Sequence, residues 1–172
     1  MNKTKRKIFE TSMKLFAEKG YDATSIEEIT SVVGVAKGTL YYHFSSKEEI
    51  FHFLVDEGMK LLQNSISIKT AQKTNSIDKL KSIVLIQLKV LYKYEDFMTI
   101  IFSQLWGNEP RNIECKKYVV QYLKIIEEII QDGINKGEII EADPETIASE
   151  IFSTTCISLI YRIKKDTKIS IN

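Results

Sequence analysis

Apolar residues recur along most of this chain at spacings of three and four positions, which is the period of an amphipathic helix. Strand-like alternation of β-branched residues is absent, and the chain holds only two prolines and seven glycines. The apolar stripes and the signals that bound them predict eight helices, over about residues 3–19, 24–34, 36–44, 45–69, 77–94, 96–107, 112–136 and 144–165. The sequence therefore predicts an all-α fold.

Start and stop signals are crowded between residues 20 and 50. Gly20 and Gly34 stand where helices are expected to end, and four Ser/Thr-x-x-Glu pairs have the capping-box spacing, at positions 24/27, 25/28, 45/48 and 46/49. These signals divide the N-terminal third into short helices, whereas the later helices are longer. We therefore expect a three-helix domain over residues 2–62, followed by a larger helical bundle over residues 63–172.

The stretch VGVAKGTLYYHF, residues 33–44, follows a short helix and a tight turn. Gly34 is expected to make the turn, and a few apolar side chains have the spacing needed to hold the two short helices together. These expected core residues are Val33, Val35, Leu40 and Phe44. The pattern is typical of a helix-turn-helix, here residues 25–44, whose second helix enters the major groove of DNA.

The remaining residues of this stretch suit contact with DNA. Gly38 would let the helix backbone approach closely, and Lys37 would place a positive charge beside phosphate. Hydroxyl groups and rings on the same helix can contact base edges or the backbone, and the start of the preceding helix can reach the backbone from the other side. The candidate DNA-binding residues are Thr24, Ser25, Lys37, Gly38, Thr39, Tyr41, Tyr42, His43 and Lys47.

Composition and charge narrow the function classes. The chain is 44% hydrophobic and 27% charged, as soluble globular proteins are, with a net charge of +1. Residues 1–47 carry eight Lys/Arg against five Asp/Glu, so a polyanion is expected to meet only this front end. The two cysteines indicate neither a disulfide framework nor a zinc site. Without a signal-peptide pattern or an 18-residue apolar run, we expect a cytoplasmic protein with no membrane partner.

The contiguous run GYDATSIEEITSVVGVAKGTLYYHFSSKEEIF, residues 20–51, resembles the N-terminal domain of the TetR family of bacterial transcriptional repressors. The shared features are the Gly-Tyr after the first helix, the Gly-Val turn, the Lys-Gly-Thr-Leu-Tyr helix and the Ser-Lys-Glu-Glu start of the fourth helix. The resemblance covers residues 2–62. Thr30 departs from it, since the family usually has alanine there, packed between the two helices of the helix-turn-helix.

This resemblance implies a function for the rest of the chain. In the family, a small molecule bound in the helical second domain shifts the fourth helix and changes the separation of the two recognition helices in a homodimer. A palindromic operator requires a fixed spacing of roughly 34–36 Å or a multiple of it, so the ligand releases the DNA. We therefore expect double-stranded DNA, a small-molecule inducer and a second copy of the chain as partners.

Bulky side chains in the second domain favour an apolar or aromatic ligand. The candidate pocket residues are Phe97, Phe102, Trp106, Tyr118, Tyr122, Phe152, Cys156 and Tyr161, although each is also an ordinary core residue. The last expected helix carries a broad apolar stripe, which favours a dimer interface through Ile147, Ile151, Thr155 and Leu159. The family has a further C-terminal helix, which is either absent here or lies beyond the end of this sequence.

An enzyme is not expected, because the two histidines and the acidic pairs stand in no recognisable catalytic or metal arrangement. No cofactor is expected either, apart from an unidentified small-molecule effector. The rival interpretation is a helical protein that senses or carries an apolar ligand and uses the helix-turn-helix for protein contacts. Activation instead of repression is a third possibility, which the sequence does not separate from repression.

Overall fold

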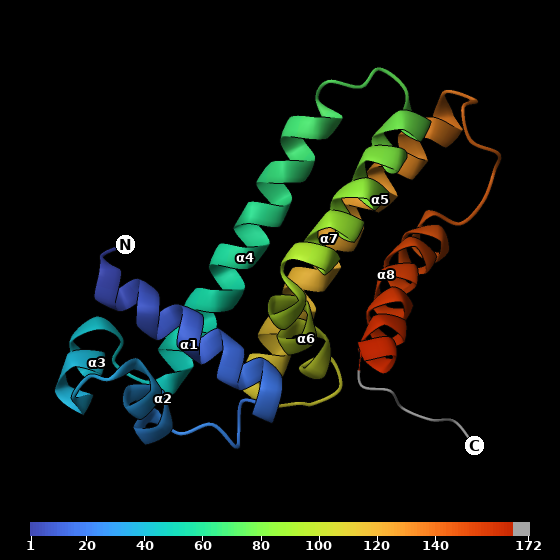
Figure 1. Ribbon diagram of the computed structural model, residues 1–172. Helices are drawn as coiled ribbons and strands as arrows, with labels where there is room; N and C mark the ends of the chain where they lie inside the picture. Colours follow the sequence, from blue (N-terminus) through green and yellow to red (C-terminus); the bar gives the residue numbers. More distant parts are fainter. Residues whose placement is uncertain (167–172) are drawn as a thin grey trace, which may run out of the picture. The chain divides into compact units, whose positions relative to one another are not determined.

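The computed structural model describes the backbone of residues 1–166, and within this range it describes every side chain except those of residues 155, 156 and 158–166. This described range contains helices and no strands. The helices are α1 (Lys3–Lys19), α2 (Ile26–Val33), α3 (Lys37–His43), α4 (Lys47–Thr70), α5 (Ser76–Lys93), α6 (Glu95–Ser103), α7 (Pro110–Asn135) and α8 (Pro144–Asp166) (Figure 1). The predicted all-α fold is confirmed.

Several predicted helix ends are confirmed by their capping contacts, whereas α7 begins at Pro110 and not at residue 112 as predicted. Gly20 and Gly137 both have positive φ angles at helix ends, of 87° and 70°. Ser25 accepts a hydrogen bond from the backbone of Glu28 at 3.1 Å, which is one of the predicted capping pairs. These ends follow from short-range spacing, so the sequence alone was enough to find them.

The bounds of α6 differ from the prediction of residues 96–107. The helix begins at Glu95, because the single residue Tyr94 separates it from α5, and Asp96 therefore lies inside its first turn rather than capping it. It ends at Ser103, after which the N–H groups of Gln104 and Leu105 make tighter i→i+3 hydrogen bonds. The predicted stop at Gly107 was therefore too late.

Contacts between residues divide the chain into two units. Unit 1 comprises Met1–Lys60 and Asp96–Lys116, and unit 2 comprises Leu61–Glu95 and Lys117–Asn172. Helices α4 and α7 each contribute residues to both units. The domain ranges expected from the sequence, 2–62 and 63–172, stay predictions.

The core of unit 1 is built by α1 to α4 together with α6 and the start of α7. Its buried large side chains include Ile8, Phe16, Ile29, Leu40, Phe44, Ile50, Phe51, Leu54 and Ile100. Aromatic rings meet edge to face within it, as Tyr21 and Phe51 do with centroids 5.2 Å apart. Burying each such side chain stabilises the fold by about 1.5–3 kcal/mol, so this small unit has a substantial core.

Unit 2 contains α5, α7 and α8, which lie alongside one another (Figure 1). Its buried core includes Ile83, Leu91, Ile126, Ile130 and Ala148. At one end, the Ser76 N–H donates to the Glu138 carboxylate at 2.6 Å, which joins the start of α5 to the turn after α7. Within the described residues, no helix combines the length and the apolar character needed to span a membrane.

Gly58 in α4 faces the ring of Phe97 from α6, both within unit 1, and a methyl group at this position would overlap that ring. We predict that Gly58→Ala lowers the free energy of unfolding by about 1–3 kcal/mol, although alanine favours helix by about 1 kcal/mol. Urea unfolding would measure the change. When Gly58→Ala is combined with Phe97→Leu, the double variant should lose less unfolding free energy than the two single variants together. A Gly58→Ala variant as stable as the original chain would contradict this close approach.

Candidate nucleic-acid interface

The turn between α2 and α3 is held by backbone hydrogen bonds and by one lysine. Gly34 has left-handed φ and ψ angles of 77° and 40°, which glycine adopts without strain. The N–H groups of Gly34 and Val35 both donate to the Thr30 carbonyl, at 2.9 and 3.0 Å. The Lys7 ammonium donates to the carbonyl of Val33, the last residue of α2, at 2.8 Å. The turn therefore sets the direction of α3.

Helix α3 has one buried and one exposed face. Leu40 is fully buried, as is Phe44 directly after the helix, which confirms them as core residues. The side chain of Tyr41 is 50% exposed and that of Tyr42 is 84% exposed. Neither tyrosine ring is covered by the rest of the chain. Exposed aromatic side chains that lie side by side are typical of a surface that contacts a partner. The exposed face of α3 is therefore the candidate interface.

Gly38 lies on this exposed face. No atom outside its own helix lies within 4 Å of where a Cβ atom would stand, and its backbone does not require glycine. Packing within the chain therefore gives no reason for glycine here. A smooth surface at the start of α3 is what close approach of another backbone would require.

Lys37 begins α3 and forms an ion pair with Glu27 of α2. The hydrogen bond with Glu27 raises the pKa of Lys37, and the same bond lowers the pKa of the Glu27 carboxyl group. Both side chains are more than half exposed, so the pair adds little to stability. The lysine is therefore charged and held at the helix start, where a phosphate can replace the carboxylate.

Three other candidate residues border the same face. Ser25 is exposed at the N-terminus of α2, while Thr39 and His43 are half-buried on α3. The His43 ring meets the Tyr42 ring with centroids 5.0 Å apart, so these two side chains are positioned together. The structure thus brings seven of the nine candidates to the surface formed by α3 and the start of α2. They are Ser25, Lys37, Gly38, Thr39, Tyr41, Tyr42 and His43.

Thr24 and Lys47 differ from the other candidates because both are engaged inside unit 1. Thr24 is 1% exposed, and its hydroxyl donates to the Gly20 carbonyl at 2.8 Å. The Lys47 ammonium donates to the carbonyls of Tyr21 and Thr24 at 2.9 and 2.8 Å. Their polar atoms hold the loop between α1 and α2, so the structure gives both residues an internal role.

Tyr21 is a residue of this region that sequence reasoning did not select. Its ring is buried against Phe16 and Phe51, and its hydroxyl donates to the Glu48 carboxylate at 2.8 Å. The guanidinium of Arg111, at the start of α7, lies 4.8 Å from the centroid of the same ring. Burial raises the pKa of Tyr21, and the bond to Glu48 raises it further. The Gly-Tyr pair after the first helix was the only signal.

Two lysines of α1 were also missed. Lys7 caps α2, as described above, and the Lys5 ammonium lies 4.6 Å from the centroid of the Phe44 ring, directly after α3. The signal was the basic run KTKRK at residues 3–7. Positive charge from α1 therefore borders the helix-turn-helix.

The pocket candidates are divided between the two units. Phe97, Phe102 and Trp106 belong to unit 1, whereas Tyr118, Tyr122 and Phe152 belong to unit 2. Trp106 is 88% exposed, so this chain does not enclose it, while Phe97 and Tyr122 are buried. Tyr122 and Phe152 lie together, with ring centroids 6.0 Å apart. Cys156 and Tyr161 lie outside the described side chains.

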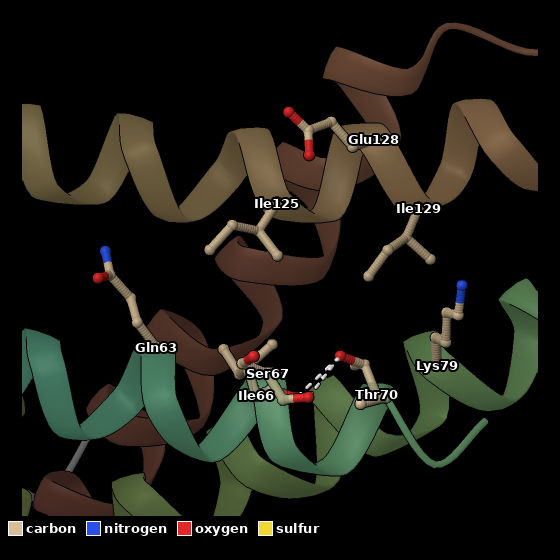
Figure 2. A pocket seen from close by; sticks show the side chains of 9 residues that line it. Gln63, Ile66, Ser67, Thr70, Lys79, Ile125, Glu128 and Ile129 are labelled. Atoms are coloured by element: carbon tan, nitrogen blue, oxygen red, sulfur yellow. Dashed lines mark hydrogen bonds between the residues drawn. The ribbon is translucent and has the colours of Figure 1, made fainter.

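Unit 2 also has a cavity of about 420 Å³ between α4, α5 and α7 (Figure 2). It is lined by Gln63, Ile66, Ser67, Thr70, Ala71, Lys79, Ile125, Glu128 and Ile129. Figure 2 shows Ile125 and Ile129 pointing from α7 toward α4, with Lys79 at one end. None of the six pocket candidates whose side chains are described lines this cavity. Sequence reasoning missed it because aliphatic residues on three separate helices carry no local signal.

Of the dimer candidates, Ile147 and Ile151 are half-buried on α8. Thr155 and Leu159 lie outside the described side chains, so the interface stays a prediction. Among the described side chains, no three His, Cys, Asp or Glu residues gather as a metal site requires.

Comparisons with known proteins identify relatives of this chain. The family model for bacterial regulatory proteins of the tetR family matches residues 8–54, which include the whole helix-turn-helix. A Clostridium perfringens protein assigned to the regulation of fatty acid metabolism has a similar structure, with a TM-score of 0.87 and 34% identity. The match covers 96% of this chain and 89% of that one.

Two further relatives are regulators by name. The fatty acid degradation regulator FadR of Bacillus halodurans has a TM-score of 0.83 and 25% identity, over 98% of this chain and 88% of its own. The negative transcriptional regulator IcaR of the Staphylococcus aureus biofilm operon is 40% identical over 114 residues, or 66% of this chain and 59% of its own length. The chain spans 50% to 59% of the length of the curated relatives that it matches.

We predict that Lys47→Met lowers the free energy of unfolding by about 1–3 kcal/mol, because the carbonyls of Tyr21 and Thr24 would lose their donor. Thermal or urea unfolding would measure the loss. The matched control is Lys14→Met, since Lys14 is exposed on α1 and should change stability by less than about 0.5 kcal/mol. Equal stability of the two variants would show that Lys47 does not hold the loop.

Proposed function

Because the chain belongs to the tetR family of bacterial regulatory proteins, we propose that it is a ligand-responsive transcriptional repressor that has no enzymatic activity and acts in the cytoplasm. The observation that carries the proposal is the exposed face of α3, where Gly38 is open to solvent and Tyr42 is 84% exposed. Repression, rather than activation, is supported by the name of IcaR, a negative regulator.

In this proposal, α3 enters the major groove of an operator. Gly38 allows the start of the helix to approach the DNA, and the Tyr41 side chain reaches base edges beside it. Lys37 exchanges its partner Glu27 for a phosphate, and Tyr42 contacts the backbone. The lysines near the start of α1 add further positive charge next to the same face.

We further propose that the protein acts as a homodimer on a palindromic site. Two copies present two α3 helices, and their half-sites must be separated by roughly 34–36 Å or a multiple of that distance. The separation of the two helices is therefore the quantity that an effector must change. A ligand that binds better to the dimer with the wrong separation shifts the population away from the DNA-binding state.

The effector is proposed to bind in unit 2. Helices α4 and α7 continue from unit 2 into unit 1, where their first residues contact Tyr21. A shift of either helix would therefore act on the loop that supports the helix-turn-helix. A small apolar ligand is favoured by the isoleucines in the cavity of Figure 2 and by the names of the two fatty acid regulators with similar structures.

The test of DNA binding is a mobility shift on the DNA upstream of the protein's own gene. Lys37→Ala and Tyr42→Ala should each weaken binding about tenfold, because each removes a backbone contact, while stability is unchanged. Lys37→Ala should also reduce, by about one, the slope of the logarithm of the binding constant against the logarithm of the salt concentration. Unchanged binding by both variants at several salt concentrations would contradict the assignment of α3.

Glu27→Ala is the matched control, because it should not weaken DNA binding as Lys37→Ala does. It removes the carboxylate that competes with phosphate for Lys37, so binding should become about as tight or a few-fold tighter. Weaker binding by Glu27→Ala would show that the ion pair positions Lys37 for DNA instead of competing with it.

Gly38→Ala separates stability from DNA binding. The added methyl group meets no atom of the chain, so stability should stay the same or rise by up to about 1 kcal/mol. Operator affinity should nevertheless fall by about tenfold or more, because the methyl group stands between the helix and the DNA. The two readouts are a thermal unfolding curve and a mobility shift, and full operator affinity would mean that DNA does not approach Gly38.

A further inference from the structure

Unit 2 contains two buried polar side chains whose polar atoms have no partner. Gln87 of α5 is 5% exposed and Tyr122 of α7 is 1% exposed. Neither the nitrogen nor the oxygen of the Gln87 amide makes a hydrogen bond, and the Tyr122 hydroxyl makes none either. The two side chains lie within reach of each other: burial raises the pKa of Tyr122, and a contact from the Gln87 amide lowers it in part, although the geometry of this contact is not that of an ordinary hydrogen bond. Three unsatisfied polar atoms therefore gather at one place.

Such a cluster needs an explanation, because nearly all buried polar groups in folded proteins are hydrogen-bonded. A buried donor or acceptor without a partner lowers stability, whereas leucine and phenylalanine would fill the same two positions without that loss. The local fold does not need the polar atoms, since both residues lie within regular helices. Even a bond between the two side chains leaves part of the Gln87 amide without a partner, and a polar group from a bound molecule can supply it.

The surroundings of this cluster are apolar. The Tyr122 ring lies beside Phe152, and the fully buried Ile83 and Ile126 stand one helical turn from Gln87 and Tyr122. Burial raises the pKa of Tyr122, and no ionised side chain contributes to the shift. The environment therefore suits an uncharged group, because a buried ion without a countercharge is strongly disfavoured.

The spacing of residues along α5 and α7 places the cluster on the helix faces that line the cavity. On α5, Lys79 of the cavity precedes Gln87 by eight residues, and on α7, Ile125 and Ile129 follow Tyr122 by three and seven residues. These spacings place the residues of each helix on one face. At 1.5 Å per residue, Gln87 stands on the order of 12 Å along α5 from Lys79.

We propose that Gln87 and Tyr122 bind the one hydrogen-bonding oxygen, a carbonyl or a hydroxyl, of an uncharged and otherwise apolar effector. The hydrocarbon part extends toward Ile125 and Ile129 of the cavity. This inference rests on the proposed function, in which unit 2 binds an effector. The Gln87 amide nitrogen and the Tyr122 hydroxyl donate to a carbonyl oxygen, and the Gln87 oxygen accepts from a hydroxyl.

The experiment compares four probes of equal chain length by thermal unfolding of the full chain without DNA. Methyl octanoate and 1-octanol carry an uncharged oxygen, octanoate carries a charge, and octane carries neither. The two uncharged oxygen compounds should raise the melting temperature most, and the rise should grow with the logarithm of their concentration once the site is largely filled. No shift with either compound, or a larger shift with octanoate, would overturn the proposal.

Substitutions then locate the site. Gln87→Leu and Tyr122→Phe should melt about 2–6 °C higher without a probe, since each removes an unsatisfied buried group. They should bind methyl octanoate about tenfold more weakly while keeping the affinity for octane. Gln121→Leu, an equal replacement at an exposed position of α7, should change neither property. Lower melting with unchanged probe affinity would mean that the pair is only structural or holds an internal water, and the proposal would fail.

Operator binding by the same variants without a probe keeps this result separate from the proposed function. Gln87→Leu and Tyr122→Phe lie in unit 2, away in sequence from the helix-turn-helix, and should bind the operator as the original chain does. If the original chain fails to bind DNA but the probe series follows the expected order, the repressor function fails and the effector site stands. If the original chain binds DNA but the probe series does not follow the expected order, the repressor function stands and the effector site fails.

Discussion

The Lys47 ammonium, bound to the backbone carbonyls of Tyr21 and Thr24, is the interaction on which the N-terminal unit depends. It ties the first residue of α4 to the loop between α1 and α2, while the Tyr21 hydroxyl bonds to Glu48 in the next position of α4. Arg111 covers the same tyrosine ring from the start of α7. The loop that leads into α2 is therefore held by α4 and α7 together, and the position of the helix-turn-helix follows from theirs.

This arrangement gives the proposed control by a ligand a physical basis. A helix transmits a displacement along its length because its backbone hydrogen bonds keep it rigid, and both α4 and α7 continue into the second unit. Their contacts with Tyr21 are a few hydrogen bonds and one stacked guanidinium, which can rearrange at modest energetic cost. Gln87 and Tyr122 of the second unit are buried without ordinary hydrogen bonds, and the proposed effector would supply a partner for them.

The exposed face of α3 shows the complementary property. Leu40 and Phe44 hold the helix against the core, so the opposite face contributes little to folding. Gly38 and the two tyrosines can therefore serve a partner without loss of stability. This separation explains why packing alone could not account for the composition of the stretch from Val33 to Phe44, and why a resemblance to a known family added information there.

The sequence by itself determined the helices, most of their caps and the division of α3 into buried and exposed faces, because these depend on residues three or four positions apart. Only the tertiary structure decided the roles of Thr24, Lys47 and Tyr21, since Lys47 reaches carbonyls 23 and 26 residues away and Tyr21 bonds to a residue 27 positions on. It also showed that Trp106 is exposed and that the polar atoms of Gln87 and Tyr122 are buried without ordinary hydrogen bonds. Contacts between helices far apart in the chain leave no periodic signal, so spacing alone could not reveal them.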